Sequence, residues 1–507
     1  MSTIRKLASG SALRAANLLA TALVSMLIMP FVVHAMGDHM YGAWALVASI
    51  IGYYGTLQIG LEPAINRYMA RALGAKDHEE CNRVFNTAIR LLSGVAVGLL
   101  AVTGILAFLA HWFAKNPSDA AVLWKLILIL GAYTALLFPT RVLQGTLEAQ
   151  LRYDRTAFID LLSLILRTTL LIVIVLRGYK VVALALVQAA AGIPAIFLYI
   201  YFISKELPFL RFDARYWSRE TARKLFSFGI YSFAATIANT IRFRVDALVV
   251  ASFVGLAAVT HYRIGSTLTQ FFMGMMEALA GFFPAVFSRQ EGAANYEGLK
   301  RTYFFATKVT TCIASFVGFA LIAWGKPFIH VWMGPAYLDA YPVLVVLTTG
   351  LIVTLSQIPS PQLLYGLAKH KYTALANSLE AIANLALSII LAKRYGMIGV
   401  ALGTLIPMVL VKLFIQPVYV CHLANIPYVE YIQRFFKTVA AVAGSLVIPL
   451  LLTLKFAAPS YKVLFPIGIV SAILYVVPLW LFEFSRAETN MLTRAIAPKF
   501  AVKAVRE

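Results

Sequence analysis

Charged residues are scarce in this 507-residue sequence. Asp, Glu, Lys and Arg together make up 13% of it, whereas hydrophobic residues make up 61% and the mean hydropathy is +0.80. Soluble globular proteins carry about a quarter charged residues. This shortage excludes an ordinary soluble domain, and the sequence predicts an integral membrane protein.

Cysteine is also rare, and the residue patterns of several kinds of chemistry are missing. The three cysteines (Cys81, Cys312 and Cys421) lie far apart without a C-x-x-C pair, so we expect free thiols. The eight histidines show no H-E-x-x-H or other metal-binding spacing, and there is no Walker A motif. We therefore expect no metal, no cofactor and no catalytic residues, and any ATP-driven step would need a partner protein.

Acidic residues are half as numerous as basic ones, 22 against 44, which gives a formal net charge of +22. Basic proteins often bind nucleic acid, but here the cations concentrate in alternate loops next to apolar runs. The largest cluster occupies the segment 204–224. Such a bias marks the cytoplasmic side, where Lys and Arg face anionic membrane lipids. We expect both termini in the cytoplasm, anionic lipids as partners and no nucleic acid.

Long apolar runs dominate what remains, and their length indicates helices. A spanning helix needs roughly 20 apolar residues, whereas a barrel strand needs about 10 with alternation. We read the N-terminal run as a retained first span, since it is longer than a usual signal core. Fourteen helices are predicted: 11–35, 41–65, 84–112, 120–141, 157–177, 180–203, 225–251, 256–286, 303–324, 340–365, 372–392, 397–423, 435–455 and 461–484.

An internal repeat organises these helices. Three short matches share an offset near 217 residues: "LRGYKVVAL" with "KRYGMIGVAL", "YDRTA" with "HKYTA", and "RALGA" with "RQEGA". Six helices per copy give both copies the same orientation, and such parallel repeats place a substrate site between the halves. The prediction is an all-α membrane protein with two six-helix halves (1–203 and 225–423), a basic cytoplasmic linker (204–224), two further helices (424–484) and a basic cytoplasmic tail (485–507).

Several charges lie deep inside the predicted spans. In "ANTIRFRVDALVV", residues 238–250, Arg242 and Asp246 are 40° apart on one helix face and can pair, whereas Arg244 lies 200° from both. A charge at the bilayer centre costs roughly 2.5–3.5 kcal/mol, so these side chains need a partner or water. We predict that Arg242, Arg244, Arg263 and Lys412 bind an anionic group, with Asp246, Glu62, Glu277 and Glu380 as ion-pair or gating acids. The alternative is an internal ion-pair network without cargo.

Local motifs also resemble those of a known family. They are "GLEPAINRYMARALGAKD" (60–77), "RVDALVVASFVGLAAVTHYRIGSTL" (244–268), which contains Asp246, Leu248, Gly255 and Tyr262 in a D-x-L-x(6)-G-x(6)-Y pattern, and "YGMIGVALGT" (395–404). With the helix count and the basic linker, they resemble the polysaccharide-transport branch of the multidrug/oligosaccharidyl-lipid/polysaccharide exporter superfamily. The resemblance covers nearly the whole chain.

This resemblance implies a Wzx-type flippase of the bacterial inner membrane. Its substrate would be an oligosaccharide linked to a polyprenyl diphosphate, an O-antigen or polysaccharide repeat unit, and its partners the glycosyltransferase and glycan polymerase machinery. Related lipid II flippases carry arginines in both halves of the cavity, but the deep cations here lie mainly in the second half. Two alternatives stay open: a multidrug or cation antiporter of the same superfamily, and a membrane glycan polymerase.

Overall fold

The computed structural model describes residues 3–58, 61–113, 116–280, 283–292, 296–367, 371–423, 425–456, 460–485 and 488. All regular elements within these stretches are helical. The chain forms two compact units, Met1–Thr260 and His261–Glu507, each treated separately below. Helix α9, Arg219–Phe253, packs against helices of the first unit. The division into two six-helix repeats around the 204–224 linker stays a prediction.

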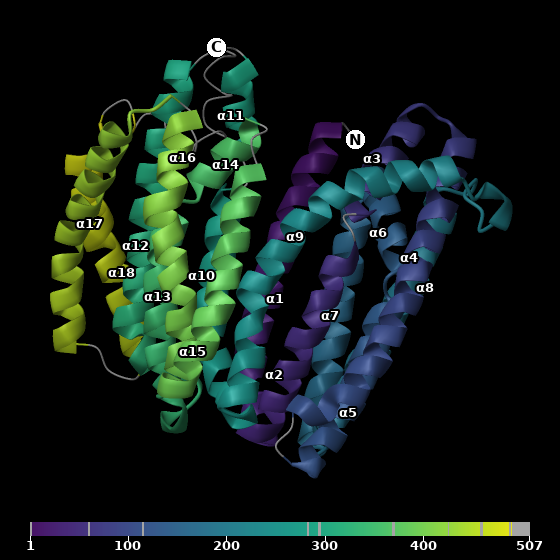
Figure 1. The fold of residues 1–507 in the computed structure, drawn as a ribbon, viewed down its shortest axis with the longest axis horizontal. Coiled ribbons are helices and arrows are strands. Elements are labelled where there is room, and N and C mark those ends of the chain that lie inside the picture. Colours follow the sequence, from purple (N-terminus) through teal and green to yellow (C-terminus); the bar gives the residue numbers. More distant parts are fainter. Residues whose placement is uncertain are drawn as a thin grey trace. The chain divides into compact units, whose positions relative to one another are not determined.

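The first unit consists of long helices interrupted by short breaks (Figure 1). Helix α1 packs on α7, α4 on α5, and α7 on α8. Its elements are α1 (Thr3–Met36), α2 (Asp38–Gly52), the 3-10 turn η1 (Tyr53–Gln58), α3 (Leu61–Gly74), α4 (His78–Phe108), η2 (Leu109–Phe113), α5 (Pro117–Leu136), α6 (Thr140–Ala149), α7 (Tyr153–Leu176), α8 (Val181–Glu206), η3 (Ala214–Tyr216) and α9 (Arg219–Phe253).

The second unit is built around α12 and α13, with α17 and α18 packed side by side against α12 (Figure 1). Its elements are α10 (Leu256–Ala280), which begins in the first unit, α11 (Phe283–Gly292), α12 (Tyr296–Trp332), η4 (Pro335–Tyr337), α13 (Ala340–Ser356), α14 (Pro359–Gly366), α15 (Lys371–Leu410), the π-helix η5 (Val411–Ile415), α16 (Gln416–Leu423), α17 (Tyr428–Phe456), α18 (Tyr461–Pro478) and the π-helix η6 (Leu479–Glu483).

The predicted apolar segments are helical apart from short turns, but several differ from the prediction in their ends or continuity. The segment 340–365 is not one helix, because a turn at Gln357 and Ile358 separates α13 from α14. The segment 41–65 is not one helix, because a 3-10 turn separates α2 from α3. The helix predicted for 120–141 continues through a bend at Pro139 into α6, which ends at Ala149. Proline removes a backbone donor and bends a helix without stopping the chain from resuming it. Sequence hydropathy missed this extension because α6 is largely polar on one face.

The helices carry their apolar side chains outward as well as inward. Leu27 and Phe108 are 75% and 77% exposed, and many other large apolar side chains are similarly uncovered. Within the described chain, nine helices are long and apolar enough to cross a membrane. Apolar surface of this kind is stable only against lipid. The protein is therefore an all-α, multi-pass membrane protein, as the sequence predicts, while the count of fourteen spans stays a prediction.

The basic linker is fastened to α4 by two asparagines one turn apart. Asn82 donates to the Phe209 carbonyl (3.1 Å) and accepts from the Arg211 amide (2.8 Å). Asn86 donates to the Arg211 carbonyl (2.8 Å) and accepts from the Asp213 amide (3.0 Å). Each carboxamide thus donates one hydrogen bond to the linker backbone and accepts one from it, as the peptide groups of a neighbouring β-strand would. The linker keeps a fixed path although it has little regular structure of its own.

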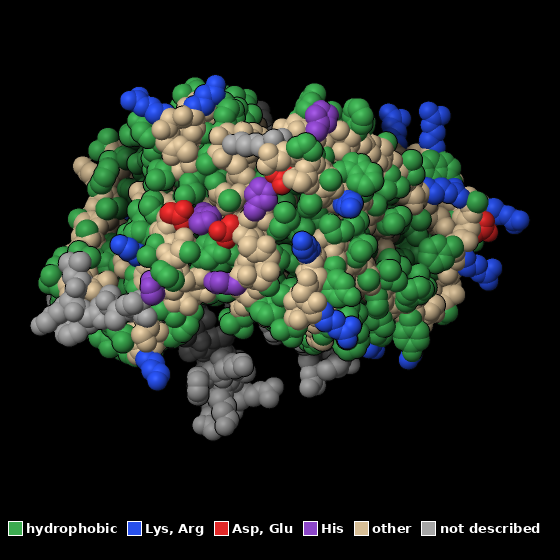
Figure 2. All heavy atoms as spheres, turned by 90° about the horizontal axis from the view of Figure 1, so that it is seen from below, with side chains coloured by type: hydrophobic (Ala, Val, Ile, Leu, Met, Phe, Trp, Pro, Cys, Tyr) green, Lys and Arg blue, Asp and Glu red, His purple; other side chains and the backbone are tan. Residues whose placement is uncertain are grey.

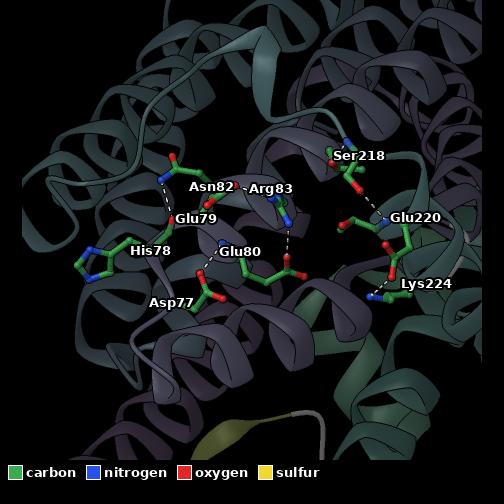
Figure 3. A network of polar contacts seen from close by, with 11 residues as sticks. Asp77, His78, Glu79, Glu80, Asn82, Arg83, Ser218, Glu220 and Lys224 are labelled. Atoms are coloured by element: carbon green, nitrogen blue, oxygen red, sulfur yellow. Dashed lines mark hydrogen bonds and ion pairs between the residues drawn. The ribbon is translucent and has the colours of Figure 1, made fainter.

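The starts of α4 and α9 carry ion pairs within single helix turns (Figure 3). Arg83 pairs with Glu79, and Lys224 pairs with Glu220 at 2.7 Å. The Lys224 ammonium holds the pKa of the Glu220 carboxyl below its usual value. Asp77 and Ser218 cap the two helices by accepting from backbone amides three residues on. These contacts define where each helix begins.

Each unit contains a histidine–aspartate pair. In the first unit His39 Nε2 lies 2.7 Å from Asp119 Oδ1, and in the second unit His261 Nδ1 lies 2.5 Å from Asp339 Oδ1. The partners are 80 and 78 residues apart, and the second pair lies 222 and 220 positions after the first. Figure 2 shows histidine side chains beside acidic side chains on the face that it draws. The shift is close to the repeat offset found in the sequence.

Candidate functional site

A sharp turn of the second unit lies inside α15. Gly396 adopts φ 57° and ψ −137°, a backbone conformation that favours glycine, and the helix reverses direction there. The two arms then touch closely, because a Cβ added at Gly403 would lie 2.4 Å from the backbone nitrogen of Ser388. The arms 371–395 and 397–423 therefore form a helical hairpin, as predicted from the separate runs 372–392 and 397–423.

A seam of buried polar side chains runs along this hairpin. Asn384 donates to the Thr404 hydroxyl across the arms at 3.2 Å. The hydroxyl oxygen of Ser388, which is fully buried, lies 3.1 Å from the Asn384 side-chain oxygen and 3.3 Å from the Val400 carbonyl oxygen, and its single proton is donated to one of them at a time. Buried polar groups inside a membrane protein are costly unless they bond to one another. The sequence gives no direct sign of this seam, since these residues are uncharged.

Lys412 lies at the deep end of the seam. It is only 4% exposed, and its Nζ donates to Gln416 Oε1 (2.7 Å) and to Asn377 Oδ1 (3.4 Å) on the facing arm. It is 11 residues from Leu423, about 16 Å at 1.5 Å per residue. It also falls within the π-helix η5, a rare geometry that often marks functional sites. Lys412 is thus buried and held by two carboxamide oxygens, whereas its role in binding an anion stays a prediction.

Glu380 belongs to the same seam. It is 1% exposed and lies one helical turn from Asn377, the residue that contacts Lys412. The structure therefore brings together two of the predicted site residues, an acid and a base, in one helical hairpin. Of the described residues, the buried charged ones are four acids and a single base: Asp119, Glu148, Asp246, Glu380 and Lys412.

Arg263 has different surroundings. It is partly buried on α10, where Gly265 faces α13 so closely that an added Cβ would lie 2.8 Å from the Ala340 carbonyl oxygen. Two residues span about 200° on a helix, so Arg263 lies on the side of α10 opposite α13. Within the part of the chain that the structure describes, no carboxylate is within 4.0 Å of its guanidinium. Arg263 is thus a membrane-embedded cation without an internal counter-ion there.

The remaining predicted residues are scattered. Arg242 and Arg244 lie on α9, but their side chains fall outside the described residues, so the predicted pairing of Arg242 with Asp246 stays a prediction. Asp246 itself is buried at 8% exposure. Glu62 is partly buried in the first turn of α3, whereas Glu277 is exposed on α10. The two glutamates thus differ in their surroundings, although they occupy similar places in the two halves of the sequence.

A second polar cluster in the first unit was not predicted. On α6, Arg141 donates to Gln144 (3.2 Å), and Gln144 donates to the buried Glu148 (3.3 Å). The signal in the sequence was the spacing Arg141, Gln144, Glu148, which places three polar side chains on one helix face. The predicted helix 120–141 ends before Gln144 and Glu148, so the sequence did not show that these side chains share a helix face with Arg141.

Comparison with known proteins identifies a matching family and similar membrane proteins. The family described as polysaccharide biosynthesis protein matches residues 7–290. A curated relative from Shigella flexneri, a putative O-antigen transporter, is 23% identical over 417 residues, covering 80% of this chain and 96% of the relative. The uncharacterized membrane protein EpsK of Bacillus subtilis (strain 168) is 21% identical over 408 residues, covering 79% of this chain and 80% of that protein.

Solved structures share the architecture. The lipid II flippase MurJ, in an inward closed conformation, superposes with a TM-score of 0.72 at 16% identity, covering 92% of this chain and 98% of that one. An inward-facing multidrug resistance MATE transporter of the MOP superfamily gives a TM-score of 0.72 at 17% identity, covering 80% and 94%. These likenesses show the fold, and the family match spans more than half of the chain. The chain therefore belongs to the polysaccharide biosynthesis protein family.

Proposed function

We propose that the protein is a flippase for an oligosaccharide linked to a polyprenyl diphosphate. It moves the substrate from the inner to the outer leaflet of the cell inner membrane by alternating access, with both termini in the cytoplasm. Family membership, the resemblance to a putative O-antigen transporter and the fold shared with a lipid II flippase support this proposal. Glycosyltransferases supply the substrate, and a glycan polymerase consumes the product.

The observation that carries the proposal is the placement of Arg263. It lies seven residues into α10, about 10 Å along the helix, and is partly buried without a carboxylate partner among the described residues. A cation near the bilayer centre costs roughly 2.5–3.5 kcal/mol. Water and an anionic head group offset that cost, and the guanidinium suits a two-point grip on a diphosphate.

The chemistry of the substrate explains why such a site is needed. Sugars and phosphates lose hydrogen bonds to water in hydrocarbon, at a cost of several kcal/mol for each unsatisfied group. The protein supplies polar partners while the polyprenyl tail stays in lipid. With the cell interior negative, an outward-moving anion gains about 2.3 kcal/mol per charge per 100 mV, so a diphosphate with two charges gains about 4–5 kcal/mol. The membrane potential alone therefore favours outward movement.

The test is single replacement of Arg263, Arg242 and Arg244 by Ala in cells that lack their own flippase. Surface glycan, measured with a specific antibody, should fall at least about tenfold, as expected for losing one charge-assisted contact. Arg263→Lys keeps the charge and should retain part of the activity. Arg223→Ala, at an exposed position in the first turns of α9, is the matched control. Full surface glycan in all three variants, at equal protein levels, rejects the proposal.

One observation favours a second candidate, a multidrug or cation antiporter of the same superfamily. The buried carboxylates Asp246 and Glu380 would suit a cationic cargo or a coupling proton. The two functions separate in one experiment with the full chain. An antiporter would lower cellular accumulation of a cationic dye and lose this ability on Glu380→Gln, with no effect on surface glycan.

A further inference from the structure

A pocket of about 290 Å³ lies in the second unit, where α12 and α17 run side by side (Figure 1). Its walls come from the first half of α12, the first turns of α17 and Glu488, which follows η6. The pocket lies near the ends of α12 and α17 that the sequence predicts to be cytoplasmic. None of the described side chains assigned to transport lines it, so we treat it as a separate site.

The pocket carries an excess of positive charge. Lys308 pairs with Glu488 at 3.2 Å, and Arg434 pairs with Glu430 at 2.9 Å. Lys437 also lines the pocket, and among the described side chains no carboxylate lies within ion-pair distance of it. Among the described residues, the acids thus neutralise part of the basic wall, and the Lys437 ammonium has no carboxylate within ion-pair distance that would compete with an external anion. The hydroxyls of Thr311 and Thr438 add polar contacts in the same wall.

The depth of the pocket matches the lipid head groups. Lys308 lies 24 residues before the end of α12 at Trp332, about 36 Å along the helix. Arg434 lies 22 residues before the end of α17 at Phe456, about 33 Å. The hydrocarbon core is about 30 Å thick, so both cations fall just beyond its edge if the far helix ends mark the opposite boundary.

Aromatic side chains line the same level. Tyr303, Tyr431 and Phe435 form a stack with successive ring centroids 6.1 Å apart. The guanidinium of Arg434 lies 4.4 Å above the centre of the Phe304 ring. Aromatic residues concentrate at the membrane–water interface, and basic pockets between spanning helices on the cytoplasmic side suit anionic lipid head groups. The aromatic rings of this wall therefore hold the cationic side chain of Arg434 in position before any ligand binds.

We propose that this pocket binds the phosphate of an anionic diacyl phospholipid of the phosphatidylglycerol class. Lys437 and Arg434 contact the phosphate, and Lys308 is held in place by Glu488. The acyl chains follow the outer face of α17, where Val447, Ile448 and Leu451 are 51%, 52% and 60% exposed. A lipid fixed there joins α17 to α12 and stabilises the second unit.

Native mass spectrometry of the purified full chain tests this directly. Dioleoylphosphatidylglycerol and dioleoylphosphatidylcholine are titrated separately, and bound lipid is counted. Lys437→Gln should weaken phosphatidylglycerol binding about fivefold, because one basic residue near a membrane surface contributes roughly that factor. Arg434→Gln combined with Lys437→Gln should weaken it about 25-fold. Phosphatidylcholine binding should not change.

The matched control is Lys462→Gln, which removes an exposed lysine from the first turn of α18. It should bind phosphatidylglycerol like the unmodified protein, and the melting temperature of each variant verifies that it is folded. Unchanged phosphatidylglycerol binding in folded Lys437→Gln overturns the proposal. The proposal is also overturned if soluble sn-glycerol 3-phosphate displaces bound phosphatidylglycerol as well as phosphatidylglycerol itself does. The site would then recognise the phosphate group alone and not a lipid.

Discussion

Replacing Lys412 by Met separates a role in transport from a role in folding. Methionine has a similar length but no charge and no donor, so it removes the contacts from Nζ to Gln416 and Asn377. Lys412 is 4% exposed and Glu380, on the same seam, is 1% exposed. We expect Lys412→Met to abolish most transport and also to destabilise the protein, because it leaves the Glu380 carboxylate in a hairpin that has lost its base.

The two effects are measured separately. Losing the Lys412 donor leaves its acceptors on Gln416 and Asn377 without that partner, and an unsatisfied buried acceptor costs about 1–3 kcal/mol. Lys412→Met combined with Glu380→Gln also removes the buried charge of Glu380, so the double variant should be more stable than Lys412→Met alone. A lost charge-assisted contact to cargo is worth about 1.5–3 kcal/mol, or roughly 10- to 150-fold in activity. The double variant should stay at that reduced activity.

The assay pairs thermal unfolding of the purified protein with surface glycan in cells that lack a flippase. Lys412→Arg, which keeps the charge, should retain more activity than Lys412→Met. The reasoning fails if the double variant transports as well as the unmodified protein, because Lys412 would then serve only to neutralise Glu380. It also fails if Lys412→Met leaves both measurements unchanged.

Three further predictions concern other parts of the fold. Gly403→Ala places a Cβ 2.4 Å from a backbone nitrogen on the facing arm, so it should lower the free energy of unfolding by about 1–3 kcal/mol, measured by thermal or denaturant unfolding against Gly444→Ala, where an added Cβ meets nothing within 4 Å. Asn86→Ala removes the acceptor of the Asp213 amide at 3.0 Å, so hydrogen exchange at Asp213 should accelerate while exchange in the core of α4 stays unchanged. Burial raises the pKa of Glu488, but hydrogen bonds from Ser485 and the charge of Lys308 outweigh it and hold that pKa below 4.5. The contribution of this carboxylate to stability should be present above about pH 4.5 and lost as the pH falls below it, and Glu488→Gln should remove that dependence from thermal unfolding curves.

The helical segments were largely predictable, whereas their breaks were not. The predicted runs are helical apart from short turns because a backbone in lipid must satisfy its own hydrogen bonds, so apolar runs of about 20 residues have few alternatives. The 3-10 turn between α2 and α3 lies inside an apolar run, and hydropathy does not register it. The extension of α5 into α6 was missed for the opposite reason, since a polar face hid a helix that continues past Pro139.

The sequence predicted the depth of some charged residues, but not the polar contacts around them. Sequence geometry identified Lys412, Glu380 and Arg263 as charges too deep to face lipid, and the structure buries the first two and partly buries the third. It did not identify the uncharged members of the hairpin seam, because asparagine, serine and threonine in a spanning helix carry no distinctive signal by themselves. Nor could it distinguish Glu62 from Glu277, which occupy similar sequence positions but differ in exposure.

The sequence by itself determined that this chain is a helical membrane protein with deep charges. Composition and the length of the apolar runs predict the spanning helices, and the position of a charge within its run predicts its depth. Only the tertiary structure decided which of those groups meet. Lys412 reaches Asn377 across 35 residues, and His39 reaches Asp119 across 80. Such contacts depend on the rotation and tilt of packed helices. Neighbouring side chains set both, and no spacing along the chain encodes them.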